Sequence, residues 1–108
     1  MPKVLFICSQ AKLRSPTAEA VFAEYPGVET MSAGLDKGAA SPLSSDMIEW
    51  ADQILVMEKR HKSKLSERYR AFLKEKRVGV LGIPDDYDYM DEALVKRLQT
   101  VVPRYPKL

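Results

Sequence analysis

The chain contains a single cysteine, a single histidine and no long apolar run, and each shortage excludes a class of protein. One cysteine, Cys8, cannot form an internal disulfide or supply a cysteine-rich zinc site. No apolar stretch approaches the length that spans a bilayer, and the first residues lack the small-residue cleavage site of a signal peptide. We therefore expect a cytoplasmic protein with a reduced Cys8, no metal site and no membrane partner.

Neither sign of charge dominates, because 17 lysines and arginines face 15 aspartates and glutamates, for a net charge of +2. This balance argues weakly for an anionic small molecule as ligand and makes binding to nucleic acid an unfavoured hypothesis. A hydrophobic content of 45% is enough to form a core, so the chain is globular rather than disordered. Its 108 residues fit one domain, which we expect to span 1–108.

Short apolar runs alternate with helical periods along the chain, without an internal repeat. The continuous apolar run 3–7 predicts a strand buried on both faces, as in a parallel sheet. Ser15 and Pro16 then predict the start of a helix, with the serine as N-cap, and Pro26-Gly27 predicts its end. Further strands are expected at 28–33, 53–57 and 78–81, and further helices at 44–50, 59–74 and from residue 91 onward.

This alternation predicts an α/β fold, a single three-layer domain with a central four-stranded parallel sheet and helices on both faces. In such sheets ligands bind beyond the carboxyl ends of the strands. The loops after Ile7 and after Leu81 both leave that edge, so we expect the functional site there.

The segment from Cys8 to Pro16 combines a cysteine at the end of a buried strand, an arginine six positions later and the start of a helix. Such a loop can direct its backbone N–H groups and the helix N-terminus toward one point, which suits a tetrahedral oxyanion. Arg14 could bind two of the anion's oxygens, and the positive field favours the nucleophilic thiolate of Cys8. Ser15 is placed to donate a hydrogen bond to the sulfur. The residues expected to line this substrate-binding loop are Ser9, Gln10, Ala11, Lys12 and Leu13.

A simpler interpretation is that Cys8 is only a small buried hydrophobe at a strand end. For an isolated cysteine we would prefer it. The combination with Arg14 and with the Ser15-Pro16 helix start favours the functional interpretation instead.

This segment resembles the signature of the low-molecular-weight protein tyrosine phosphatase family. That signature is an apolar strand, then C-x5-R-S-P, then a helix that often reads Ala-Glu-Ala-Val-Phe, and here these parts are Cys8 to Pro16 and 18–22. Segments similar to later parts of the family pattern, including its Asp-Pro-Tyr loop, follow in order at 32–34, 51–57 and 83–87.

The resemblance implies a phosphomonoester hydrolase, specifically a protein tyrosine phosphatase, that needs no cofactor. Cys8 would form a cysteinyl-phosphate, Arg14 would bind the phosphate, and Asp85 would act as general acid and then as general base. The implied ligands are a phosphotyrosine protein or a small aryl phosphate, with inorganic phosphate or sulfate in the loop. Tyr87 would flank the aromatic leaving group, although a tyrosine there can also simply anchor the loop.

The chain departs from the family pattern at several positions. Gln10-Ala11 stands where the family has Gly-Asn, and that asparagine helps to hold the loop in its unusual conformation. Ala11 has no side-chain hydrogen bond to give and is strained at positive φ, which predicts a less rigid loop. Asp86 replaces the proline of the Asp-Pro pair, so the acid is Asp85 or Asp86, and we prefer Asp85 because it follows Pro84.

Two rival functions remain open. A catalytically weak phosphate- or phosphoprotein-binding module would use the same loop, which Ala11 favours, but binding alone needs neither the Cys8 nucleophile nor an acid. Arsenate reduction on a related scaffold normally passes electrons through further cysteines, which this chain lacks. The basic run 59–62, which contains His61, is expected to be a solvated helix face.

Overall fold

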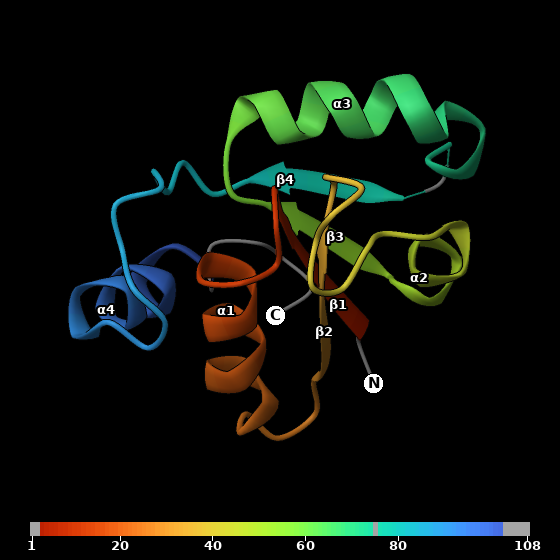
Figure 1. Ribbon diagram of the computed structural model, residues 1–108. Helices are drawn as coiled ribbons and strands as arrows, with labels where there is room; N and C mark the ends of the chain where they lie inside the picture. Colours follow the sequence, from red (N-terminus) through yellow and green to blue (C-terminus); the bar gives the residue numbers. More distant parts are fainter. Residues whose placement is uncertain (1–2, 75, 103–108) are drawn as a thin grey trace.

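The computed structural model describes residues 3–74 and 76–102, which form a sheet and the helices that cover it (Figure 1). The expected strands and helices are confirmed, with small shifts at their ends. The predicted helix 59–74 is shorter than expected, because its last part is only a 3-10 turn. In chain order the elements are β1 Lys3–Cys8, α1 Arg14–Ala23, β2 Glu29–Gly34, α2 Ser45–Trp50, β3 Gln53–Val56, α3 Lys59–Tyr69, η1 Arg70–Phe72, β4 Arg77–Val80 and α4 Glu92–Val101.

The sheet has four strands in the order β2-β1-β3-β4, and every pairing is parallel. β1 therefore has a hydrogen-bonded neighbour on each side, with Cys8 opposite Gly34 of β2 and Ile7 opposite Val56 of β3. The predicted α/β fold with a central parallel sheet is confirmed. All four strands end at one edge, where the loops after β1, β2, β3 and β4 meet.

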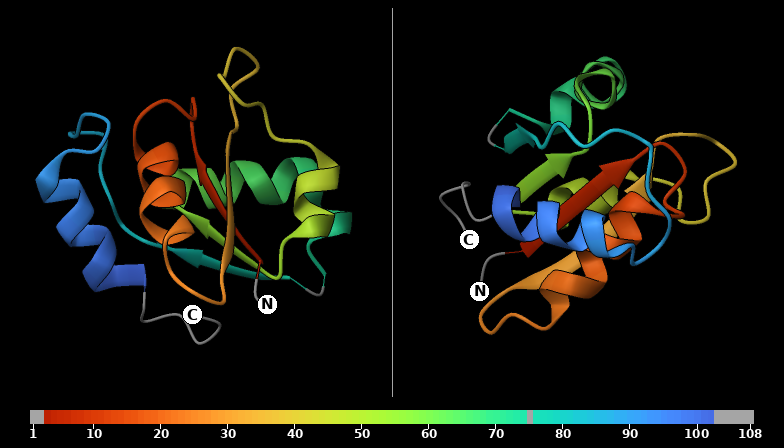
Figure 2. Two further views of the ribbon diagram at one scale, coloured as in Figure 1. Left: turned by 90° about the horizontal axis from the view of Figure 1, so that it is seen from below. Right: turned by 90° about the vertical axis from the view of Figure 1, so that its left-hand side faces the viewer.

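Helices cover both faces of the sheet, with α3 on one side and α1 and α4 on the other (Figure 2). β1 sends Phe6 and Cys8 into the core under α1 and α4, and it sends Leu5 and Ile7 into the core under α2 and α3. These side chains are at most 3% exposed, which explains why the strand is apolar at every position rather than at alternate ones. No helix in the described part of the chain is long and apolar enough to cross a membrane.

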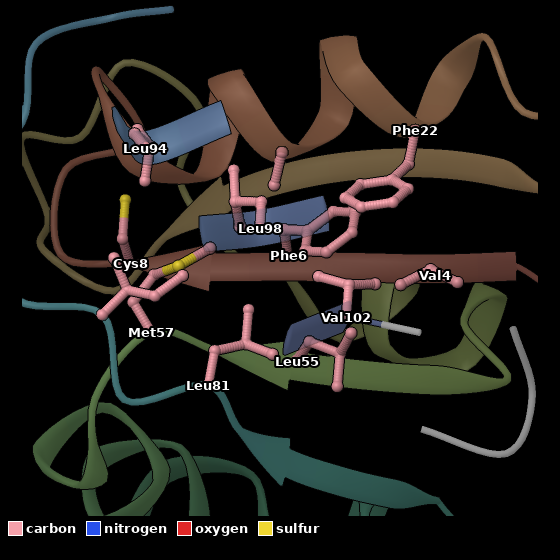
Figure 3. Close-up of a cluster of buried hydrophobic side chains, with 12 residues drawn as sticks. Val4, Phe6, Cys8, Phe22, Leu55, Met57, Leu81, Leu94, Leu98 and Val102 are labelled. Atoms are coloured by element: carbon pink, nitrogen blue, oxygen red, sulfur yellow. The ribbon is translucent and has the colours of Figure 1, made fainter. Parts of the chain in front are cut away.

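The core under α1 and α4 carries the cysteine at one end (Figure 3). Within it the rings of Phe6 and Phe22 stack with their centroids 5.9 Å apart. Burial of such rings stabilises β1 against α1 by a few kcal/mol. The strand end that bears Cys8 and the first turn of α1 are thereby held in a fixed relation.

The predicted N-cap of α1 is wrong. The helix begins at Arg14, after Leu13, and no side chain caps it. Ser15 lies inside the first turn, fully buried, and its hydroxyl faces the sulfur of Cys8 instead. The expected cap of the last helix is confirmed, since an Asp91 carboxylate oxygen accepts the N–H of Ala93 at 2.9 Å.

Candidate active site

Backbone carbonyls of the loop 8–14, which connects β1 to α1, accept hydrogen bonds from another segment of the chain. In a trans peptide each C=O points away from the next N–H, so carbonyls that face outward turn the N–H groups of residues 9–11 inward. Converging N–H groups form a concave site for an anion. The outward carbonyls are those of Cys8, Ser9 and Gln10, which accept the backbone N–H groups of Leu35 (3.0 Å), Asp36 (2.8 Å) and Ala40 (3.0 Å).

The segment after β2 reaches this loop because Gly34 has no side chain. A Cβ at Gly34 would lie 2.8 Å from the carbonyl oxygen of Ser9, 2.8 Å from the carbonyl carbon of Gln10 and 2.6 Å from the Cβ of Ala39. These distances are far inside van der Waals contact. The glycine of the segment 32–34 is therefore required by a close approach of two backbones.

Ala11 adopts the strained conformation that the sequence predicted. Its φ is 55°, in the left-handed region, where an alanine costs about 1–2 kcal/mol. This conformation directs its N–H at Cys8 Sγ, at 3.2 Å. Ala11 is also 5% exposed, so its methyl is packed but contributes no hydrogen bond to the loop.

Two donors face the sulfur of Cys8. Besides the Ala11 N–H, the hydroxyl of Ser15 lies 3.0 Å from Sγ, and both residues of that pair are buried. A hydrogen bond from the Ser15 hydroxyl stabilises negative charge on sulfur, both in a thiolate and in a departing thiolate. The structure thus brings together the predicted nucleophile and its predicted donor.

Arg14 is 2% exposed and its guanidinium is held in place by other loops of the same edge. Its Nη1 donates to the carboxylate of Glu58 at 2.5 Å and to the carbonyl of Ile83 at 2.8 Å, and its Nε lies 3.7 Å from Asp85 Oδ1. Hydrogen bonds from Arg60 and Arg14 lower the pKa of Glu58 to about 2, against the opposing effect of burial. Glu58 is therefore ionised at neutral pH and keeps the arginine oriented. The sequence analysis did not single out Glu58.

His61 is not the solvated residue that the basic run predicted, and this expectation is wrong. The imidazole is 1% exposed, its Nδ1 accepts the backbone N–H of Glu58 at 3.0 Å, and its Nε2 lies 3.0 Å from Ser9 Oγ. Burial lowers the pKa of His61 to about 4, and the charges of Arg14 and Arg60 act in the same direction. The ring is therefore neutral at pH 7 and touches the loop. A Glu-x-x-His spacing directly after a buried strand was the signal available for it.

A cavity of about 390 Å³ opens over the sulfur. Asp85 lies on its wall while Asp86 does not, and the expected Tyr87 packs against the core instead. Asp36 and Arg60 line it as well, and the sequence analysis missed both. The lining residues are Cys8, Ser9, Gln10, Lys12, Leu13, Arg14, Asp36, Arg60 and Asp85.

The sequence and the fold of the chain were compared with those of known proteins. No model of a known family matches the chain. A curated relative, the protein-arginine-phosphatase of Geobacillus stearothermophilus, is 31% identical over 62% of this chain and 62% of the relative. The low-molecular-weight protein tyrosine phosphatase of Streptococcus pyogenes superposes with a TM-score of 0.78 at 17% identity, covering 96% of this chain and 93% of that one. The resemblance to the low-molecular-weight protein tyrosine phosphatase family is confirmed.

The family fold has also been solved with an anion bound. The tyrosine phosphatase Wzb from Escherichia coli K30, in complex with phosphate, superposes with a TM-score of 0.76 at 21% identity and covers 94% of each chain. The curated match, by contrast, spans less than two thirds of the relative's length. Within residues 3–74 and 76–102, no three His, Cys, Asp or Glu side chains are grouped so as to hold a metal ion.

Proposed function

We propose that the protein is a cysteine-dependent phosphomonoester hydrolase that works through a cysteinyl-phosphate. The observation that carries this proposal is the position of Cys8, which lines the cavity and whose Sγ accepts the Ala11 N–H and lies 3.0 Å from the Ser15 hydroxyl. A binding site alone would need no sulfur there.

In the first step the thiolate of Cys8 attacks phosphorus, the S–P bond forms, and the bond from phosphorus to the leaving oxygen breaks. Asp85 gives its proton to that oxygen. Arg14 and the inward N–H groups hold the three remaining phosphate oxygens, as phosphoryl transfer requires charge stabilisation more than covalent chemistry.

In the second step a water attacks phosphorus and gives a proton to Asp85. The S–P bond breaks and inorganic phosphate leaves. The hydroxyl of Ser15, 3.0 Å from the sulfur, stabilises the thiolate that departs. The cycle needs a reduced Cys8, which agrees with the cytoplasmic location expected from the cysteine content.

We propose phosphotyrosine in proteins, or a small aryl phosphate, as the substrate. Phosphoarginine is a second candidate, named by the activity of the curated relative and supported by the cavity wall. That wall carries the carboxylates of Asp36 and Asp85 and, among the described residues, no aromatic side chain. Carboxylates pair with guanidinium N–H groups, whereas an aryl ring is better matched by aromatic walls.

The test is hydrolysis of p-nitrophenyl phosphate, a phosphotyrosine peptide and phosphoarginine by pure protein, with EDTA and a reductant present and Cys8→Ser as control. Turnover that survives EDTA and disappears in the variant supports the proposal, and the preferred substrate decides between the two classes. Turnover that persists in Cys8→Ser refutes the assigned nucleophile. No turnover on any substrate, with phosphate still protecting Cys8 from alkylation, supports the phosphate-binding module instead.

A further inference from the structure

We propose that His61 is a positioning residue for the loop 8–14: as the neutral tautomer protonated at Nε2, it donates to Ser9 Oγ and leaves the Ser9 hydroxyl hydrogen to point at the bound phosphate. This inference rests on the proposed phosphate site. It assigns a role to a buried histidine that contacts neither the sulfur nor the proposed acid.

The tautomer follows from the hydrogen bonds on the two ring nitrogens. Nδ1 lies 3.0 Å from the backbone nitrogen of Glu58, and a backbone amide can only donate, so Nδ1 must carry a lone pair. A neutral ring then has its proton on Nε2. The partner of Nε2 is Ser9 Oγ at 3.0 Å, which is therefore the acceptor.

The consequence for Ser9 is directional. Once its oxygen accepts from His61, its own hydrogen is free to donate, and the Ser9 hydroxyl forms no other hydrogen bond with the described residues. Ser9 lines the cavity. The chain of donors from the Glu58 N–H through His61 to Ser9 thus ends at the place where an anion would bind, and such chains strengthen each bond within them.

The conformation of the loop shows why support from His61 is needed. Ala11 offers no side-chain hydrogen bond, although it holds a strained φ of 55°. Instead, two residues at the start of α3 form hydrogen bonds with the two ends of the loop. His61 holds Ser9 near its beginning, and the Glu58 carboxylate holds Arg14 at its end.

The tautomer can be observed directly, because His61 is the only histidine in the chain. A long-range proton–nitrogen NMR correlation of the imidazole should show the Nε2–H form at pH 7, with Nδ1 bearing a lone pair. A proton on Nδ1, or a charged ring at pH 7, would overturn the proposal. This measurement does not depend on turnover.

Two substitutions of His61 distinguish the proposed positioning role from a purely structural role. Asparagine at 61 places an oxygen near the Nδ1 position, so it keeps the acceptor for the Glu58 N–H and loses the donor to Ser9. Glutamine places an NH2 near the Nε2 position, so it keeps the donor and loses the acceptor. The readout is the concentration of inorganic phosphate that half-protects Cys8 against iodoacetamide, and melting temperatures verify that each variant is folded.

We expect His61→Asn to raise that concentration roughly tenfold, and His61→Gln to raise it less, since a hydrogen bond that serves a charged ligand is at stake. Ser9→Ala should raise the half-protecting phosphate concentration as much as His61→Asn does. The double variant that combines these two substitutions should raise it little further than either one alone. Lys62→Gln, an exposed neighbour on α3, is the control and should leave the value unchanged.

The reverse order, with glutamine worse than asparagine, or additive losses in the double variant, would assign His61 to helix capping and core packing alone. If phosphate fails to protect Cys8 even in the unmodified protein, the proposed phosphate site falls. The NMR measurement then still reports whether His61 is the neutral tautomer protonated at Nε2.

Discussion

A single methyl group added at Gly34 should distort the proposed phosphate site while the sheet stays in place. In Gly34→Ala the new Cβ would meet the Ser9 carbonyl oxygen and the Gln10 carbonyl carbon at 2.8 Å, and each contact must lengthen by about 0.6 Å to become ordinary. Both atoms belong to backbone and cannot rotate away. Overpacking of this kind costs about 1–3 kcal/mol, which lowers the melting temperature by roughly 5–20 °C.

Phosphate binding should be weakened as well. The same two carbonyls accept the hydrogen bonds that turn the inner N–H groups toward the anion, so moving them misdirects those donors. Loss of one hydrogen bond to a charged group costs about 1.5–3 kcal/mol. We therefore expect phosphate to bind at least tenfold more weakly.

Both effects can be measured on one preparation, by thermal unfolding and by phosphate protection of Cys8 from iodoacetamide. A single cysteine makes the alkylation unambiguous. Gly38→Ala is the matched control, since it lies in the same connection and a Cβ there meets nothing within 4 Å. If Gly34→Ala behaves like Gly38→Ala in both assays, the argument that backbone contact shapes this loop is refuted.

Three further outcomes are expected. Asp85→Asn should slow hydrolysis of phenyl phosphate by roughly 10²–10⁴-fold and that of p-nitrophenyl phosphate much less, because only the poorer leaving group needs the proton. If steady-state rates show this pattern for Asp86→Asn instead, the general acid is Asp86. Glu58→Gln should lower the free energy of unfolding by about 2 kcal/mol in urea titrations, because buried Arg14 loses its hydrogen-bonded carboxylate and keeps only the longer contact with Asp85, and an unchanged value would contradict this. The pKa of His61 falls from 6.5 to about 4 on folding, so the unfolded chain binds the extra proton between these values. The free energy of unfolding should therefore decrease as pH falls from 6.5 to 4, and a slope that persists in His61→Gln would assign it to another group.

The parts of the site that lie close together in the sequence were predictable from it. Cys8, Arg14 and the following helix form one short segment, and strand-to-helix geometry alone directs them to one point. The positive φ of Ala11 was expected from the resemblance, because the family has an asparagine at that place in the loop. Ser15 was expected both to cap the helix and to face the sulfur of Cys8; the helix cap was wrong, because the helix begins one residue earlier, and the contact with the sulfur is present.

Apart from Asp85, which the resemblance supplied, the parts that depend on distant segments were not predicted. His61 stands among lysines and arginines, and the one local signal that this position of α3 faces inward, its spacing from Glu58, was outweighed by the basic run. Glu58 meets Arg14 across 44 positions of sequence, and Gly34 matters only because another backbone passes against it. Such roles are set by the strand order β2-β1-β3-β4, which brings the loops after neighbouring strands together.

The backbone bonds that carry the outward carbonyls of Cys8, Ser9 and Gln10 have a consequence for how such a protein can diverge. Both partners in each bond are main-chain atoms, with the N–H groups supplied by residues 35, 36 and 40. The support therefore does not depend on the side chains at those three positions. Asp36 contributes an N–H to the frame and a carboxylate to the cavity wall, and the second can be exchanged without the first. Under the proposed function, side chains on the cavity wall that select the group attached to phosphorus can therefore be replaced without loss of the backbone bonds that shape the loop around Cys8.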